Sequence, residues 1–253
     1  MEKTLYYNTT YKGISKSEIY LIRASKENGI MVFGVEELRR ISGWNRVKIH
    51  NTLNSMREKN IITRIKRNKY VITEDVQKNI YKISTSVFSP SYISFWTALS
   101  FYNFTEQHVK AIQVVSTRQY KNIKINGFLL EPSKFRPEKF YGYHVIEGVI
   151  IAEKEKALID SFFMMEKCGG FDEIVKCLKN SWKEIEQEKF FDYLTQFGSK
   201  SCVSRVGYII ENSGLKTEYS FRNLEQYKSE TFVKLNPANK KSGNYNKKWS
   251  IIY

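Results

Sequence analysis

The first regular pattern of hydrophobic and polar positions along the chain has the period of an α-helix. Ser15 followed by Glu18 is a capping-box pattern, which predicts a helix that extends to about Lys26. Ile19 and Ile22 of this helix are expected to face inward. The pattern therefore places the first element of a folded domain close to the start of the chain.

Two further helices are predicted after a short apolar link. Val35, Leu38 and Ile41 share one face of the second helix, which Gly43 ends. A third helix begins near Asn45, because Asn is a favourable N-cap residue. Helix, short glycine-containing turn and helix together are typical of a helix-turn-helix.

The third helix divides into an apolar and a polar face. At about 100° per residue, Ile49, Leu53 and Met56 fall on one narrow arc and form the expected core stripe. The opposite face holds amides and cations, with no acid before Glu58. Because Asn and Arg make bidentate contacts to adenine and guanine edges, we expect this face to read duplex DNA. The residues expected to do so are Asn45, Arg46, Val47, Lys48, His50, Asn51 and Asn54.

A β-hairpin is predicted after the third helix. Two β-branched runs, 61–65 and 70–73, flank a polar turn. The cations of the hairpin either contact backbone phosphates beside the groove or are solvated surface charges. Three helices followed by a basic hairpin favour a winged helix-turn-helix, with DNA contacts from Arg64, Lys66, Arg67 and Lys69.

The rest of the chain mixes helical and strand patterns, so the expected fold class is α+β. The predicted elements are helices over 92–102 and 154–167, strands over 112–117, 123–129, 145–152 and 232–235, and two or three more helices up to about residue 212. Pro90 marks a boundary, because the residue before a proline avoids helical backbone angles. The expected organisation is a DNA-binding domain over 1–75, a linker over 76–89 and a mixed α/β domain over 90–253.

The charge of the chain is concentrated at its two ends. The formal net charge is +15, from 41 basic and 26 acidic residues. Residues 1–73 carry 15 basic against 6 acidic side chains, residues 74–230 are nearly neutral, and residues 231–253 carry five lysines and no acid. This distribution predicts a polyanionic partner for the ends of the chain.

Several classes of protein and site are not expected. No apolar stretch approaches the roughly 20 residues that span a bilayer, and the N-terminus lacks the apolar core of a signal peptide. Three cysteines without CxxC spacing fit a reducing cytosol, so we expect a cytoplasmic protein with no metal site. No nucleotide-binding loop or nucleophile elbow is present, so no cofactor and no catalytic residue are expected.

Three short motifs have both a chemical and a structural interpretation. Glu153 and Asp160 lie on a similar helix face, which could indicate a carboxylate pair. The preferred interpretation is structural: acids in the first turn interact favourably with the helix dipole, and Asp160 is one structural acid. Gly198-Ser199 is similar to a nucleotidyltransferase motif but lacks the Asp-x-Asp that should follow. The basic tail either closes a sheet as a surface hairpin or contacts nucleic acid through Lys240, Lys241, Lys247 and Lys248.

Segments along nearly the whole chain occur in the order and spacing of a known family. They are the three-helix head, Pro90–Leu99, a strand ending in Ser116-Thr117, Ile150–Asp160, Arg205–Glu211, and Leu235–Pro237 with Trp249. On these segments the chain resembles the AbiEi-type antitoxin and transcriptional regulator family of type IV abortive-infection toxin–antitoxin pairs. Related chains often have Gly after the recognition helix, where this chain has Asn60.

The resemblance implies a repressor that binds operator repeats in its own promoter. It also implies an antitoxin, whose second domain counters a nucleotidyltransferase-like toxin without a stable complex. Two alternatives stay open: an orphan regulator without a toxin, or a protein that modulates the toxin or its tRNA substrate through the C-terminal domain.

Overall fold

The computed structural model describes residues 13–107, 109, 111–239 and 243–253 of the chain. The chain divides into two compact units. The first comprises residues 1–87 with the short segment 123–128, and the second comprises 88–122 and 129–253. The fold is mixed α+β, as expected.

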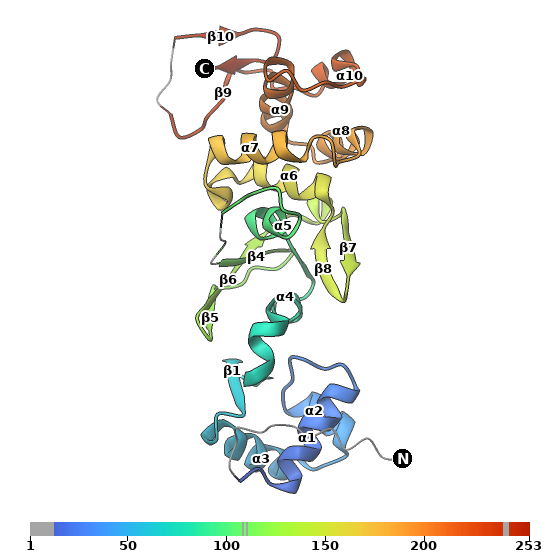
Figure 1. Cartoon of the computed structure of the whole chain (residues 1–253), viewed down its shortest axis with the longest axis vertical. Helices are drawn as coiled ribbons and strands as arrows, with labels where there is room; N and C mark the ends of the chain where they lie inside the picture. The colour runs from blue at the N-terminus through green and yellow to red at the C-terminus, as the bar shows by residue number, and fades with distance from the viewer. Residues whose placement is uncertain (1–12, 108, 110, 240–242) are drawn as a thin grey trace. The chain divides into compact units, whose positions relative to one another are not determined.

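The first unit consists of helices followed by a two-stranded hairpin and a further helix (Figure 1). Its elements are α1 (Lys16–Glu27), α2 (Val35–Ser42), α3 (Arg46–Glu58), β1 (Ile62–Lys66), β2 (Lys69–Ile72), the 3-10 turn η1 (Thr73–Asp75) and α4 (Val76–Val87). The segment expected as a linker is therefore mostly α4, which belongs to this unit. Asn79 interrupts the helical backbone of α4.

The core of the first unit is formed by one face of each of the three leading helices. Leu38 of α2 and Ile49 of α3 are fully buried, and Leu53 and Met56 lie beside them as expected. The expected inward face of α1 was wrong in part. Ile19 is 45% exposed, and Leu21 is the buried residue instead.

A buried acid determines which face of α1 packs inward. Glu18 completes the predicted capping box, because its carboxylate accepts the backbone N–H of Ser15 and its own N–H donates to the Ser15 hydroxyl. The same carboxylate, 1% exposed, accepts hydrogen bonds from Lys59 Nζ at 2.9 Å and Ser55 Oγ at 2.7 Å. These contacts tie the start of α1 to the end of α3. Ser55 is therefore partly buried.

Positive-φ residues shape the turns around α3 and the hairpin. Gly43 ends α2 with φ of 71°, and Asn60 follows α3 with φ of 56°, the left-handed conformation that Asn tolerates. Asn68 turns the hairpin with φ of 55°. Its side chain also accepts the backbone N–H of Val35 at 3.1 Å, and Phe33 pairs with Tyr70 through two backbone hydrogen bonds. The hairpin is thereby fixed to the start of α2.

The second unit contains a mixed sheet and a group of helices (Figure 1). Within this unit the sheet order is β6-β4-β3-β8-β7, and a smaller sheet has the order β10-β11-β9; strand β5 belongs to the segment 123–128 of the first unit. The strands after residue 90 are β3 (Ser91–Ile93), β4 (Ala111–Ser116), β5 (Ile123–Ile125), β6 (Phe128–Lys134), β7 (Tyr143–Ile146), β8 (Val149–Ala152), β9 (Val233–Lys234), β10 (Tyr245–Asn246) and β11 (Ile251–Ile252). The helices are α5 (Phe95–Phe101), η2 (Pro137–Lys139), α6 (Lys154–Phe163), η3 (Met165–Cys168), α7 (Phe171–Ser181), α8 (Gln187–Gln196), α9 (Lys200–Asn212) and α10 (Phe221–Glu225).

Three predicted elements after residue 90 differ from the structure. Residues 92–93, expected at the start of a helix, belong to strand β3, which pairs with β4 and β8. The expected strand 123–129 is divided into β5 and β6 at Asn126 and Gly127, both with positive φ. In the same way, Glu147 and Gly148 divide 145–152 into the hairpin β7–β8.

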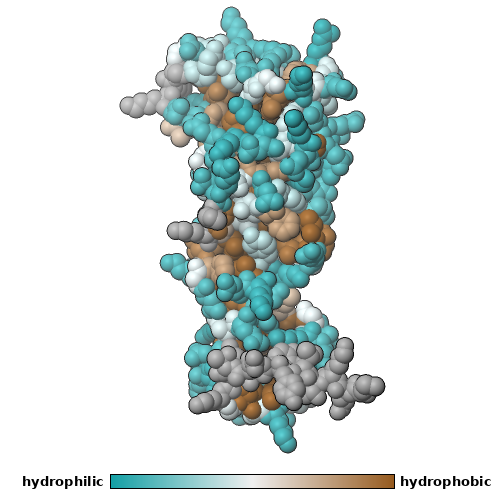
Figure 2. All heavy atoms as spheres, viewed as in Figure 1, coloured by the Kyte–Doolittle hydropathy of each residue, from teal (hydrophilic) through white to brown (hydrophobic). Residues whose placement is uncertain are grey.

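Helix α6 lies at the centre of the helical layer, where it packs against α5, α7, α8 and α9. Its Ala157, Leu158 and Phe162 are fully buried. On the face that Figure 2 shows, the surface over these helices is mostly hydrophilic, and hydrophobic side chains gather over the β7–β8 hairpin. In the described part of the chain, no helix has the length and apolar character needed to cross a membrane.

The C-terminal segment is anchored by a buried tryptophan. The ring of Trp249, 0% exposed, packs directly on the backbone of Gly207 in α9, where it leaves no room for a Cβ atom. Its indole N–H donates to Glu211 Oε2 at 2.7 Å. The motif Arg205–Glu211 thus supplies both the space and the acceptor for Trp249.

The buried acid of α1 makes the stability of the first unit depend on pH. Desolvation alone would raise the pKa of Glu18, but hydrogen bonds from Lys59, Ser15 and Ser55 lower it to about 2 from an ordinary value of 4.5. Because the pKa is lower in the folded chain, the stabilisation is complete above pH 4.5 and is lost as the pH falls toward 2.

We expect Glu18→Gln to destabilise the first unit by about 1–3 kcal/mol near pH 6 and to have progressively less effect below pH 4.5. Hydrogen exchange of the α1 and α3 amides, compared between wild type and variant at each pH, measures this. Glu27→Gln, at the exposed end of the same helix, is the control and should change little at any pH. An effect of Glu18→Gln that persists unchanged at pH 2.5 would contradict the account.

Candidate nucleic-acid interface

The residues expected on the outward face of α3 are exposed in the structure. Asn45 caps the helix, with its side-chain oxygen accepting the N–H of Lys48 at 2.9 Å. Ile49, Thr52, Leu53 and Met56 are buried, so the helix rests on one apolar stripe. The seven residues expected to contact DNA are all exposed: Asn45, Arg46, Val47, Lys48, His50, Asn51 and Asn54. They offer hydrogen-bond donors and amides without a negative charge.

A basic cleft lies between α3 and the hairpin. It has a volume of about 440 Å³ and brings together cations that the sequence separates by up to about twenty residues. Arg46 and His50 come from α3, one turn apart, while Arg64 and Arg67 come from the hairpin. The complete lining is Val35, Glu36, Arg46, His50, Arg64, Arg67, Asn68 and Tyr70. Two of the four expected hairpin residues therefore face the same hollow as the start of α3.

The other two hairpin cations have partners within the protein. Lys66 Nζ donates to the carbonyl oxygen of Val87 at 3.0 Å, and Lys69 forms an ion pair with Glu37. Both lysines are half-buried, whereas Arg64 and Arg67 are exposed. Desolvation, followed by the charge of Lys69, lowers the pKa of Lys66. Although Arg64 Nε donates a hydrogen bond to the Lys66 carbonyl at 3.4 Å, Arg64 and Arg67 are more accessible than the two lysines.

Three side chains at this face were not among the expected site residues. Glu36 of α2 accepts hydrogen bonds from Arg46 Nη2 at 2.6 Å and from Arg39 Nη1 at 2.9 Å. Trp44 lies under the ammonium group of Lys48, 3.7 Å from the ring centroid, and stacks on Tyr20. The Glu36–Arg46 contact joins α2 to α3 across ten residues, and the Trp44–Tyr20 contact depends on α1, whereas Lys48 and Trp44 are only four residues apart.

The four tail lysines expected to contact nucleic acid differ in their surroundings. Lys240 and Lys241 lie outside the described residues. Lys247 is exposed, but Lys248 forms an ion pair with Glu211 beside the buried Trp249. The described part of the tail forms β10 and β11 of the small sheet, which is the surface-hairpin arrangement.

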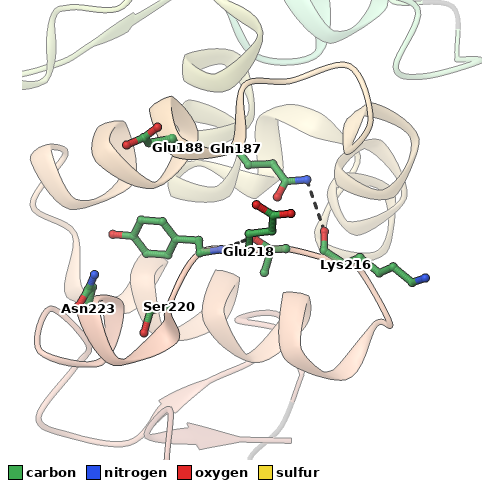
Figure 3. Close-up of a pocket in the computed structure, with 8 residues that line it drawn as sticks. Gln187, Glu188, Lys216, Glu218, Ser220 and Asn223 are labelled. Carbon is green, nitrogen blue, oxygen red and sulfur yellow. Dashed lines mark hydrogen bonds between the residues drawn. The ribbon is translucent and has the colours of Figure 1, made fainter.

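A second hollow, of about 830 Å³, lies in the second unit between the start of α8 and the segment that leads to α10. Figure 3 shows its lining of mixed polar side chains, with the Gln187 amide donating to the Lys216 carbonyl at 3.4 Å. Glu188 and Glu218 are its acids and Lys216 its cation. The lining residues include neither His nor Cys.

The acids singled out on α6 do not form a carboxylate pair. Glu153 accepts a hydrogen bond from Tyr193 at 2.6 Å and pairs with Lys189. Asp160 is fully buried and accepts hydrogen bonds from Ser94 Oγ at 2.7 Å and Tyr92 at 3.1 Å. Each acid therefore has its own separate partners.

Asp160 also forms a buried ion pair with Lys156, one turn earlier on α6. Both side chains are 0% exposed, and Lys156 Nζ donates to the Tyr92 hydroxyl at 2.8 Å. The ammonium group lies 5.1 Å from the ring centroids of Tyr141 and Phe197. Burial lowers the pKa of Lys156 and raises that of Asp160, while their mutual attraction opposes both shifts. The cluster is closed to a substrate and connects α6 to β3.

The remaining motifs have structural positions. Gly198 has a positive φ and Ser199 is the N-cap residue of α9. The three cysteines are buried thiols, and burial raises the pKa of Cys168 and Cys177 to about 12. Among the described residues, no group of three or more His, Cys, Asp or Glu side chains is arranged to hold a metal ion.

Comparison with known proteins addresses the fold. No family model matches the chain. No curated protein matches its sequence. A crystal structure of the RV2827C protein from Mycobacterium tuberculosis is similar, with a TM-score of 0.63 over 94% of this chain and 92% of that chain, at 9% sequence identity. At this identity the similarity concerns the fold alone.

The buried ion pair gives a test of the second unit. Replacing one member leaves the other charge buried without its counter-ion, which typically costs 3–5 kcal/mol, whereas replacing both is often nearly neutral. We expect Lys156→Met and Asp160→Asn each to lower the free energy of unfolding by about 3 kcal/mol or more.

The double variant should lower the free energy of unfolding by clearly less than the sum of the two single changes, because no charge is left unpaired. The residual cost should be about 1–3 kcal/mol, since Tyr92 and Ser94 lose a charged acceptor. Urea unfolding of the four proteins measures the cycle. Additive costs would show that the two charges do not depend on one another.

Proposed function

We propose that the chain is a sequence-specific duplex-DNA-binding regulator whose first unit is a winged helix-turn-helix. In this proposal α2 and α3 are the helix-turn-helix, α3 enters the major groove, and β1–β2 is the wing. The observation that carries the proposal is the convergence of the acid-free face of α3 with Arg64 and Arg67 of the hairpin around one cleft.

The charges and geometry of the unit support a division of labour. Asn51, exposed in the middle of α3, presents an amide suited to an adenine edge, and Arg46 at the start of the helix suits a guanine edge. Arg64 and Arg67 lie across the cleft and suit the backbone phosphates that border the groove. The second unit has the smaller excess of positive charge, with 23 basic against 18 acidic residues.

The proposal predicts salt-dependent and sequence-dependent binding to the DNA upstream of the protein's own gene. Affinity should fall steeply between low and moderate salt, because each phosphate contact releases condensed counterions. Asn51→Ala and Arg46→Ala should reduce the preference over an unrelated duplex by roughly 1–3 kcal/mol each. Arg64→Ala and Arg67→Ala should weaken binding to both duplexes alike and lower the salt slope by about 1.

Gel-shift titrations of these variants at several salt concentrations measure both effects. Lys78→Ala, which removes one exposed cation of α4 in the same unit, is the matched control and should change little. Affinity that is independent of salt, or equal for operator and unrelated duplexes, would remove the proposal. A change of base preference in the hairpin variants alone would reverse the assigned roles.

We also propose that the protein acts as an antitoxin. This part rests on the resemblance of its segments to the AbiEi-type family, and the partner would be a nucleotidyltransferase-like toxin encoded beside it. The full chain expressed from an unrelated promoter should rescue growth against that toxin. The variant Arg46→Ala/Asn51→Ala should rescue equally, because the second unit is intact. Loss of rescue in this folded variant would confine antitoxicity to repression.

A further inference from the structure

Glu36 is the one acidic side chain among the residues that line the basic cleft. It lies in the first turn of α2, with 55% of its side chain exposed, facing a cleft that also contains Arg64, Arg67 and His50. A carboxylate at this position is unexpected if the cleft serves only to attract phosphate, because a negative charge repels a phosphate at close range.

Both oxygens of Glu36 are engaged by arginines. Oε1 accepts from Arg46 Nη2 at 2.6 Å and Oε2 accepts from Arg39 Nη1 at 2.9 Å. Although desolvation opposes the shift, Arg46 and Arg39 hold the pKa of Glu36 below its ordinary value, so the carboxylate stays charged. Arg46 begins α3, and the pair therefore links the first turns of α2 and α3.

The pair changes what Arg46 can do on DNA. A guanidinium group has five donors in a planar fork, so an arginine held through one terminal nitrogen still presents other donors to a base edge. A backbone phosphate, by contrast, competes directly with the carboxylate for the same charge. While it is bound to Glu36, Arg46 therefore contributes little binding free energy on a non-operator duplex, where phosphates are the main contacts.

We propose that Glu36 is a positioning residue that raises sequence discrimination by withholding Arg46 from backbone phosphates. This inference rests on the proposed function. On an operator the ion pair is kept and Arg46 contacts a base. On an unrelated duplex the ion pair must break before Arg46 can neutralise a phosphate. The phosphate contact therefore adds no net binding free energy.

The test compares Glu36→Gln with wild type in the full-length protein. The probes are a duplex that the wild type selects from a random pool and an unrelated duplex of the same length. Glu36→Gln should bind the unrelated duplex roughly 3- to 10-fold more tightly, the scale of one screened unit charge at contact distance. Its salt slope on that duplex should steepen by about 0.9, the value for one added phosphate contact. The preference for the selected duplex should fall accordingly.

Two controls separate positioning from net charge. Glu27→Gln makes the same charge change at an exposed position at the end of α1 and should leave the preference unchanged. In an Arg46→Ala background, Glu36→Gln should no longer steepen the salt slope, because the arginine that it releases is absent. Circular dichroism confirms that each variant is folded.

An unchanged preference in Glu36→Gln, the same loss in Glu27→Gln, or an undiminished effect in the Arg46→Ala background would each overturn the inference. A wild type that binds no duplex in a salt-dependent manner would instead overturn the proposed function. A wild type that discriminates while Glu36→Gln discriminates equally well would overturn only the role of Glu36.

Discussion

The burial of one stripe of α3 is the constraint on which the candidate interface depends. Ile49, Leu53 and Met56 face the core of the first unit, and the helix therefore has to turn its cations and amides outward. Glu18 strengthens this constraint from the far end, because its buried carboxylate joins α1 to Lys59 and Ser55. Rotation of α3 about its axis would break the apolar stripe and leave Glu18 buried without partners, which is costly.

The second unit is organised by a different kind of constraint. Its central helix α6 carries a fully buried Lys156–Asp160 pair, which is satisfied by the hydroxyl groups of Tyr92 in β3 and of Ser94 at the start of α5 and is surrounded by aromatic rings. Trp249 closes the C-terminal segment on Gly207. Both features use polar groups inside an apolar core, where a specific partner is required for each. Asp160 in the segment Ile150–Asp160, and Gly207 and Glu211 in the segment Arg205–Glu211, therefore have structural roles.

The elements that the sequence predicts well are those with local causes. The face of α3 follows from a 3.6-residue period, and the capping box at Ser15 and Glu18 from two side chains three positions apart. The face of α1 was misjudged because Glu18 finds its partner Lys59 far along the chain. Strand β3 was misjudged because a short apolar run has no distinguishing period, and its pairing with β4 and β8 decides the conformation.

The same reasoning applies to the candidate site. Its residues on α3 could be predicted from the helical period of the sequence alone, whereas the positions of the hairpin cations depend on tertiary partners. Lys66 and Lys69 turn to Val87 and Glu37, which no local pattern indicates. The cleft, and the acid within it, exist only because Asn68 and the Phe33–Tyr70 pairing bring the hairpin beside α2.

The most direct measurement of the central claim is hydrogen exchange of the full chain with and without its operator duplex. If the first unit is the DNA-binding element, the bound duplex adds protection in peptides that cover α3 and the β1–β2 hairpin, and leaves the amides of α6 and α9 unchanged. Added protection that is confined to the C-terminal sheet around β10 and β11, with none in α3, would contradict the account.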